Sequence, residues 1–236
     1  CWSLRGGFHD QAGSIATSRS WLATSWPTSL PRRGSPDEGS VVMSLVDVIA
    51  GHPAVYGLIQ NLAGRDVIMR HMQPWLDQIS GRVLDVGGGT GRIFEQLRPG
   101  VRYLCVDLER RKLEGLKRTP GVTGLLADGT ALPFEAGVVD AALLIGVTHH
   151  LSEAALGAVI AEITRVLVPS GRLIMLDALW APHRLTARAL WAWDRGSHPR
   201  TAAALDAAFR ARLDIEQTMT FSILHDYCAL HCRKRR

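Results

Sequence analysis

The segment Asp85-Val86-Gly87-Gly88-Gly89-Thr90-Gly91 follows an apolar stretch typical of a buried strand and precedes a stretch that favours a helix. Gly87 and Gly89 let the backbone turn tightly and approach a ligand closely. The dinucleotide-binding fingerprint GxGxxG needs Gly or Ala at its sixth position. Counted from Gly87 that position is Arg92, and counted from Gly89 it is Phe94, so the fingerprint is absent. The segment instead follows the pattern D-x-G-x-G-x-G.

The acid that precedes the glycines, Asp85, changes what the loop is expected to bind. A carboxylate at this place repels a pyrophosphate and attracts a cation. A ligand that carries both an ammonium and a sulfonium group suits such a loop. S-adenosylmethionine (SAM) is a ligand of this kind, so the segment favours SAM over a dinucleotide.

Strand-like and helical stretches alternate along the chain after residue 81. We expect parallel strands at 83–86, 103–106, 122–127, 141–147 and 173–176, with helices at 92–97, 109–118 and between Ser152 and Pro169. Helical stretches at 182–195 and 200–213 follow, and strands at 215–223 and 227–232 form a hairpin. The repeated βα units predict an α/β fold: a Rossmann-like, seven-stranded, mostly parallel sheet with helices on both faces and an antiparallel C-terminal hairpin.

The chain divides into an N-terminal extension and one domain. Residues 1–42 are rich in Ser, Thr, Arg, Gly and Trp and lack periodicity, so we expect a disordered or non-native extension. Residues 43–236 form the predicted domain, in which helices at 43–80 make a substrate lid and residues 81–232 make the Rossmann-like core. A helical pattern covers 41–76, and Pro74 is expected to kink or end its second helix. Residues 233–236 are expected to be a basic, solvated tail.

The composition excludes a disordered, collagen-like or coiled-coil protein. The chain has 236 residues, of which 47% are hydrophobic and 21% charged, as in globular domains. The net charge is +5, and the last four residues supply +4 of it, so the charge does not indicate a nucleic-acid-binding face. No apolar run is long enough to span a bilayer. Four scattered cysteines fit a reducing compartment, and we expect a cytoplasmic protein. Cys228 and Cys232 have the wrong spacing for a zinc site, so no metal is expected.

Four further motifs accompany the glycine loop. They are Val106-Asp107-Leu108, Ala127-Asp128-Gly129, Leu132-Pro133-Phe134 with Val139-Asp140, and Arg165-Val166-Leu167-Val168-Pro169-Ser170-Gly171. With these motifs the sequence resembles the class I SAM-dependent methyltransferases, in particular the small-molecule (methyltransferase type 11, UbiE-like) group. The resemblance covers about residues 65–232. Ser170 and Val139 stand where that group usually has Gly and Phe, and these departures leave the cofactor site intact.

The resemblance implies a role for each acid. It implies that Asp107 takes the ribose hydroxyls of SAM and that Asp128 receives the adenine amino group, although Asp128 alone could be a strand-end cap. Asp140 is expected to order a turn and to touch no ligand. Asp85, Asp107 and Asp128 lie at the C-termini of three consecutive strands, at the edge where open α/β sheets bind ligands. The expected cofactor-binding residues are Asp85, Gly87, Gly88, Gly89, Gly91, Asp107, Leu108, Asp128, Gly129 and Ile145.

A methyl transfer from SAM needs in-line alignment of acceptor, methyl carbon and sulfur, and needs a general base only when the acceptor carries a proton. His149 and His150, after the fourth strand, are the candidate catalytic bases, with His149 placed ahead. A packing role is the alternative for both. The candidates for an acceptor pocket are His52, Tyr56, Trp180, His183, Trp191 and Trp193, all of which could equally be core residues.

The predicted function is methyl transfer from SAM to an O, N or C atom of a small molecule such as a quinone or polyketide. The segment Ile145-Gly146-Val147-Thr148 lacks the Asn/Asp-Pro-Pro-Tyr/Phe motif of enzymes that methylate nucleic-acid bases, so nucleic acid is not the expected partner. Three alternatives stay open: a SAM-binding, non-catalytic regulator or assembly partner, an NAD(P)-dependent oxidoreductase, and an RNA methyltransferase assisted by the basic tail. The sequence sets no oligomeric state.

Overall fold

The computed structural model describes residues 64–118, 121–181, 187, 191, 198–223 and 225–235. The predictions made for residues 1–63, which include the extension, the first helices, His52 and Tyr56, lie outside these residues. So do His183, Trp193 and most of the helical stretch predicted at 182–195.

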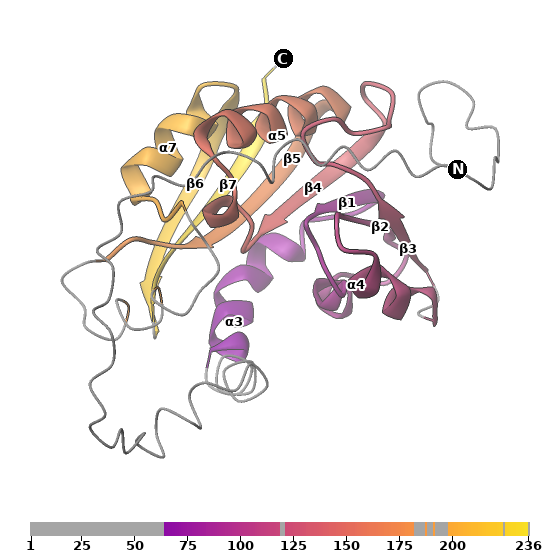
Figure 1. Cartoon of the computed structure of the whole chain (residues 1–236), viewed down its shortest axis with the longest axis horizontal. Helices are drawn as coiled ribbons and strands as arrows, with labels where there is room; N and C mark the ends of the chain where they lie inside the picture. The colour runs from indigo at the N-terminus through magenta and orange to yellow at the C-terminus, as the bar shows by residue number, and fades with distance from the viewer. Residues whose placement is uncertain are drawn as a thin grey trace, which may run out of the picture. The chain divides into compact units, whose positions relative to one another are not determined.

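A seven-stranded sheet forms the centre of the fold (Figure 1). Its strands are β1 (Arg82–Val86), β2 (Arg102–Asp107), β3 (Val122–Leu126), β4 (Val139–Ile145), β5 (Leu167–Ala178), β6 (Leu213–Ser222) and β7 (Asp226–Lys234). The strand order is β3-β2-β1-β4-β5-β7-β6. The first five strands pair in parallel, and β7 pairs antiparallel with both β5 and β6. The predicted Rossmann-like sheet with its C-terminal hairpin is therefore confirmed.

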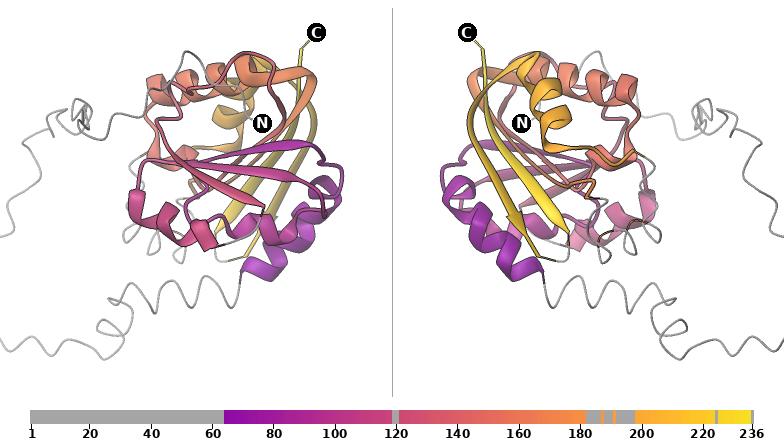
Figure 2. Two further views of the ribbon diagram at one scale, coloured as in Figure 1. Left: turned by 90° about the vertical axis from the view of Figure 1, so that its right-hand side faces the viewer. Right: turned by 90° about the vertical axis from the view of Figure 1, so that its left-hand side faces the viewer.

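Helices cover both faces of this sheet (Figure 2). One apolar cluster joins α3 (Arg65–Leu76) and α4 (Arg110–Glu114) to the sheet, and includes Trp75 and Tyr103. The other joins α5 (Glu153–Val166) and α7 (Ala202–Arg210) to the opposite face, and includes Ile160 and Phe209. Because both faces are covered, β4 is apolar from Ala141 to Ile145 without alternation.

The helix after β4 begins where the sequence predicts. Ser152 is its N-cap, since the Ser152 side chain accepts a hydrogen bond from the backbone N–H of Ala155 at 3.2 Å. The helix ends at Val166, three residues before Pro169, because β5 starts directly at Leu167. Ser170 has a φ of 63°, a left-handed conformation in which glycine is less strained. The glycine that the resemblance implies at this position would adopt the same conformation with less strain.

The helix predicted after the glycine loop is present as a short 3-10 helix, η2 (Arg92–Gln96). The prediction for the C-terminal residues was wrong. Two of the residues expected to form a solvated basic tail, Arg233 and Lys234, instead belong to β7. The Lys234 ammonium donates to the carbonyl oxygen of Leu167 at 2.6 Å, and Arg235 forms an ion pair with Asp214 at 3.0 Å.

The order of the strands fixes where a ligand is expected. From β1 the chain adds β2 and β3 toward one edge of the sheet, and it then returns to add β4 and β5 on the other side of β1. The point at which this direction reverses, the topological switch point, therefore lies between β1 and β4. Open α/β sheets bind ligands beyond the carboxyl ends of the strands at this point. Asp140 lies at the opposite edge, where its carboxylate pairs with the Arg82 guanidinium at 3.0 Å and accepts from the Arg82 backbone N–H at 2.7 Å. In the part of the chain that the structure describes, no helix is long and apolar enough to cross a membrane.

Candidate active site

The loop after β1 has the backbone that its glycines permit. Gly87, Gly89 and Gly91 have φ values of 73°, 57° and 65°, which are left-handed. Gly87 also packs against the segment after β4, because a Cβ atom there would lie 2.6 Å from Cγ2 of Val147. Gly88 lies directly over the end of β1, where a Cβ atom would lie 2.2 Å from Oδ2 of Asp85. The loop therefore needs glycine both for its turns and for its close packing.

Asp85 is a buried carboxylate beneath this loop, with 2% of its surface exposed. The Tyr103 hydroxyl donates a hydrogen bond to Oδ2. Oδ1 is buried and has no hydrogen-bond partner among the described residues. Burial raises the pKa of Asp85 to about 7, the Tyr103 hydrogen bond opposes this, and the charge of Asp107 adds to it. A buried carboxylate oxygen without a donor is costly, so this atom fits a cationic ligand.

A cavity of about 190 Å³ opens beside Asp85 and the loop. Its apolar lining comes from Met69 of α3, Ile93 of η2 and Ile145 at the end of β4. Two cationic side chains, Arg65 and Arg92, also line it, with Asp85, Gly88 and Thr90. Three of the predicted cofactor-binding residues, namely Asp85, Gly88 and Ile145, thus reach one cavity, while sequence analysis missed Arg65 and Arg92.

Asp107, at the end of β2, is tied to the glycine loop. Its Oδ2 accepts from the Gly89 backbone N–H at 3.0 Å, and its Oδ1 accepts from the Glu109 backbone N–H at 2.8 Å. Each carboxylate oxygen has two lone pairs, so both can still accept a hydrogen bond from a ligand hydroxyl. The next residue, Leu108, is exposed beside it.

Asp128, after β3, caps its own turn. Its Oδ1 accepts from the backbone N–H of Thr130 at 2.8 Å and from the Thr130 hydroxyl at 2.7 Å. The strand-end role that the sequence left open is therefore present, and a ligand role stays a prediction. Gly129 packs against β1, since a Cβ atom there would lie 2.8 Å from Cγ1 of Val86.

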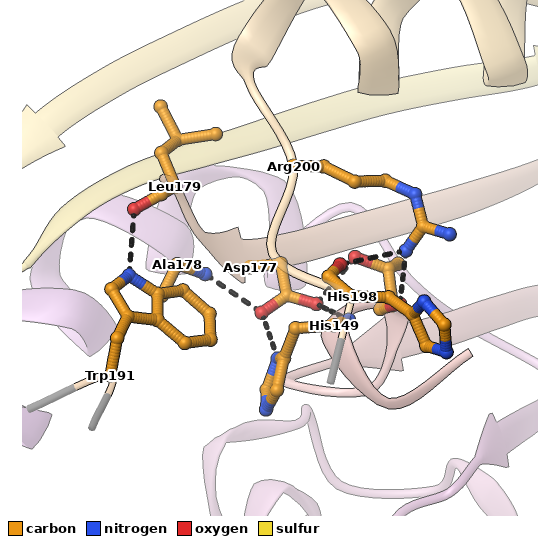
Figure 3. A network of polar contacts seen from close by, with 8 residues as sticks. His149, Asp177, Ala178, Leu179, Trp191, His198 and Arg200 are labelled. Carbon is orange, nitrogen blue, oxygen red and sulfur yellow. Dashed lines mark hydrogen bonds and ion pairs between the residues drawn. The ribbon is translucent and has the colours of Figure 1, made fainter. Parts of the chain in front are cut away.

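The two candidate histidines lie in the 3-10 turn η4 (Thr148–His150) after β4. His149 is 8% exposed, whereas His150 is exposed. The His149 Nδ1 lies 2.6 Å from Oδ1 of Asp177, an acid near the end of β5 (Figure 3). Asp177 Oδ2 accepts from the Thr148 hydroxyl at 2.5 Å and from the His149 backbone N–H at 3.1 Å. The structure thus separates the histidines, and only His149 is paired with a buried acid.

Sequence analysis missed Asp177, although one signal was available: it is an acid directly after the apolar run of the fifth strand. Burial acts to raise the pKa of this carboxyl, but hydrogen bonds and charge from His149, with donors from Thr148 and Ala178, outweigh it. The pKa of Asp177 is therefore below its ordinary value, and the group is ionised at neutral pH.

Arg200 fixes the turn that carries His149. The Arg200 side chain is 5% exposed and lies beside His198 (Figure 3). Its guanidinium donates to the carbonyl oxygens of Thr148, Leu151 and His198. It also forms an ion pair with Glu153 at 2.8 Å. The His198 backbone N–H donates to the carbonyl oxygen of His149 at 2.9 Å. No local sequence pattern marks Arg200, since its partners lie about fifty positions earlier.

Aromatic rings lie between the turn that carries His149 and the C-terminal hairpin of β6 and β7. The Trp191 ring lies edge-on to His149, with centroids 5.5 Å apart, and edge-on to His225 at 5.4 Å. The indole N–H of Trp191 donates to the carbonyl oxygen of Leu179 at 3.2 Å. Of the candidate pocket residues that the structure describes, Trp191 joins this group, whereas Trp180 is 41% exposed.

Comparison with known proteins is consistent with this site. Residues 84–175 match the family described as a methyltransferase domain. The geranyl diphosphate C-methyltransferase of Streptomyces coelicolor A3(2) has a TM-score of 0.61 and 15% identity, over 72% of this chain and 81% of that chain. A SAM-dependent methyltransferase of Methanosarcina mazei has a TM-score of 0.58 and 16% identity, over 66% and 93%. Over residues 84–175 the chain is therefore similar to the methyltransferase domain, and its sheet has the fold of these two solved enzymes.

Two of the curated relatives are methyltransferases of quinone biosynthesis by name. The demethylmenaquinone methyltransferase of Beutenbergia cavernae is 34% identical over 106 residues, which are 43% of this chain and 43% of the relative. The ubiquinone/menaquinone biosynthesis C-methyltransferase UbiE of Desulfotalea psychrophila is 28% identical over 150 residues, which are 55% of this chain and 60% of the relative. The chain spans about half the length of the curated relatives it matches.

Proposed function

We infer that the protein binds SAM and transfers its methyl group to a small-molecule acceptor. The observation that carries this function is the buried Asp85 Oδ1, which has no protein donor among the described residues and lies under a glycine loop at the switch point of the sheet. SAM supplies an electrophilic methyl group when bound. The residues of the chain then bind, orient and shield the reactants.

The site offers a partner for each polar part of SAM. Asp85 suits the ammonium group, and Arg65 and Arg92 suit the carboxylate of the same methionyl part. Asp107 suits the two ribose hydroxyls, because its oxygens retain lone pairs. Asp128, at the next strand end, remains the proposed partner of the adenine amino group.

A quinone-type ring, in its reduced form, is the acceptor that the curated relatives favour, since two of them act in menaquinone or ubiquinone biosynthesis by name. The alternatives have less support. The glycine loop lacks the sixth-position glycine of dinucleotide-binding proteins. Of the cations expected to assist RNA binding, Lys234 and Arg235 are engaged with the sheet and its edge. A SAM-binding regulator without activity shares the cofactor site, and only turnover separates it from an enzyme.

Calorimetric titration of the full chain with SAM, S-adenosylhomocysteine and NAD tests the cofactor. We expect SAM and S-adenosylhomocysteine to bind and NAD not to bind. Asp107→Ala removes hydrogen bonds to a charged acceptor, so it should weaken SAM binding by at least about tenfold. Asp206→Ala, which changes an exposed acid on α7, is the matched control and should leave the Kd unchanged. Equal Kd values for Asp107→Ala and the wild type would contradict the proposed site.

The pKa of Asp85 predicts how SAM affinity depends on pH. The carboxylate pairs with the ligand ammonium only when ionised, and its pKa is raised to about 7. SAM affinity should therefore rise about tenfold between about pH 5.5 and about pH 7, a range in which an α-amino group stays protonated. The folding stability of the ligand-free protein should change in the opposite direction, because a folded-state pKa above the unfolded value favours folding at low pH. Calorimetry and thermal unfolding of the wild type and Asp85→Asn measure both, and a pH-independent affinity in the wild type would refute the ammonium assignment.

A further inference from the structure

More hydrogen bonds hold His149 and Asp177 in place than the packing of a buried histidine requires (Figure 3). Asp177 Oδ1 accepts from the Ala178 backbone N–H at 2.7 Å and contacts Nδ1 of His149 at 2.6 Å. Its Oδ2 accepts from the Thr148 hydroxyl and the His149 backbone N–H. Four donors therefore converge on one buried carboxylate, which fixes its orientation toward the imidazole.

The orientation of Asp177 determines the tautomer of His149. An ionised carboxylate only accepts hydrogen bonds, so the proton of the neutral imidazole is held on Nδ1. The lone pair is then on Nε2, which is the arrangement of a general base. The turn itself is fixed by Arg200, which holds the carbonyl oxygens of Thr148 and Leu151.

His149 lies close in the chain to two residues of the proposed cofactor site. Ile145, at the end of β4, lines the cavity, and Val147 packs against Gly87 of the glycine loop. His149 follows two residues later in the same segment. Its ring is the first of a series of neighbouring rings that continues through Trp191, His225, Tyr227 and Phe221 to His71 of α3. The same helix contributes Met69 to the cavity.

We propose that His149 is the general base of the transfer, that Asp177 is its positioning residue, and that the acceptor carries a hydroxyl group on an aromatic ring. This inference rests on the proposed function. A base is needed only when the acceptor is protonated, as a phenol or hydroquinone is. The ring series offers aromatic surfaces on which a flat acceptor packs well.

The step balances in protons and electrons. The acceptor O–H proton passes to Nε2 of His149, and the electron pair left on the conjugated oxygen attacks the methyl carbon. The bond between that carbon and sulfur breaks, and its electron pair stays on sulfur, which yields S-adenosylhomocysteine. If the oxygen attacks, the product is a methyl ether. If the neighbouring ring carbon attacks, that carbon loses its proton and the oxygen regains one, so a single proton is released in either case.

The test measures transfer from radiolabelled SAM to catechol, 1-naphthol and anaerobically reduced 1,4-naphthoquinone by the full chain. Asp177→Asn turns one accepting oxygen into a donor group, and His149→Gln keeps a donor toward Asp177 but removes the base. We expect each variant to lower kcat by at least about hundredfold, which is within the range of general-base catalysis. The Kd for S-adenosylhomocysteine, measured by calorimetry, should stay within about threefold of the wild-type value. Asp206→Asn, the same chemical change on α7, should leave kcat unchanged.

The pH profile of kcat/KM separates positioning from simple structural support. Several groups surround His149: Asp177 from β5, His150 from the same turn, His198 and Arg200 from the segment before α7, and His225 beyond Trp191. Asp177 supplies the negative charge at contact distance, so Asp177→Asn should move the acidic limb of the profile to lower pH by about one unit. A nitrogen-15 spectrum of the wild type should show that Nδ1 of His149 is protonated and Nε2 is unprotonated at neutral pH.

Each outcome decides between the inference and the function on which it rests. Absence of SAM binding to the wild type refutes the proposed function itself. SAM binding without transfer to any of the three hydroxylated probes overturns the acceptor class. An unchanged kcat in His149→Gln overturns the base, and an unchanged kcat and pH profile in folded Asp177→Asn overturn the positioning role. Protonation of Nε2 in the wild type overturns the tautomer.

Discussion

Gly88→Ala is expected to weaken SAM binding by at least about hundredfold, because it both disturbs and covers the carboxylate that receives the ligand ammonium. A Cβ atom at this position would lie 2.2 Å from Oδ2 of Asp85 and 2.9 Å from the Cys105 sulfur. Asp85 is buried, and its Oδ2 is held by the Tyr103 hydroxyl, so the carboxylate has no room to withdraw. Calorimetric titration of the full chain with SAM measures the effect.

The control for this variant is Gly157→Ala, in the middle of α5. No atom lies within 4 Å of a Cβ placed there, so the substitution adds no clash. Alanine in a helix interior stabilises by about 0.5–1 kcal/mol relative to glycine, and SAM affinity should not change. A Kd for Gly88→Ala within threefold of the wild-type value, in a protein that unfolds cooperatively, would show that Asp85 is not a ligand of the cofactor.

The fold was predictable because its signals are local and repeated. β2, β4 and β5 each contain a continuous apolar run, and the 3.6-residue spacing of Leu156, Val159, Ile160 and Ile163 marks α5. The alternation between Ile215 and Phe221 marks a strand covered on one face. Element ends were less predictable, because neighbours in the sheet decide them: pairing extends β7 through Lys234.

The cofactor half of the site was predictable for a similar reason. Asp85, Asp107 and Asp128 lie at the ends of their strands or within two residues of them, and parallel strands bring such positions to one edge. The histidines of the turn were also visible after β4. Their difference in role was not, because it depends on Asp177, which a crossover of twenty-seven residues brings beside His149. Arg65 and Arg92 were missed because no pattern marks an arginine that lines a cavity.

Arg200→Met is expected to lower the free energy of unfolding by about 3 kcal/mol, although Arg200 is far in sequence from the turn it supports. The substitution keeps an apolar stem of similar length and removes every donor. The carbonyl oxygens of Leu151 and His198 lose a charged hydrogen-bond partner inside the protein, and that of Thr148 retains only its bond from the Leu151 backbone N–H. Denaturant unfolding of the full chain, followed by circular dichroism, measures the loss.

Two further variants show why Arg200→Met loses stability. The loss comes either from the forked geometry of the guanidinium or only from the removal of a charge. Arg210→Met removes an arginine whose ion pair with Asp206 lies on the exposed side of α7, and it should leave the unfolding midpoint unchanged. Arg200→Lys keeps the charge but concentrates its donors on one atom, which cannot reach three carbonyl oxygens in the directions that a guanidinium reaches. It should therefore recover less than half of the loss. Full recovery by lysine would mean that charge alone holds the turn, and that the position of His149 does not depend on the hydrogen bonds of Arg200.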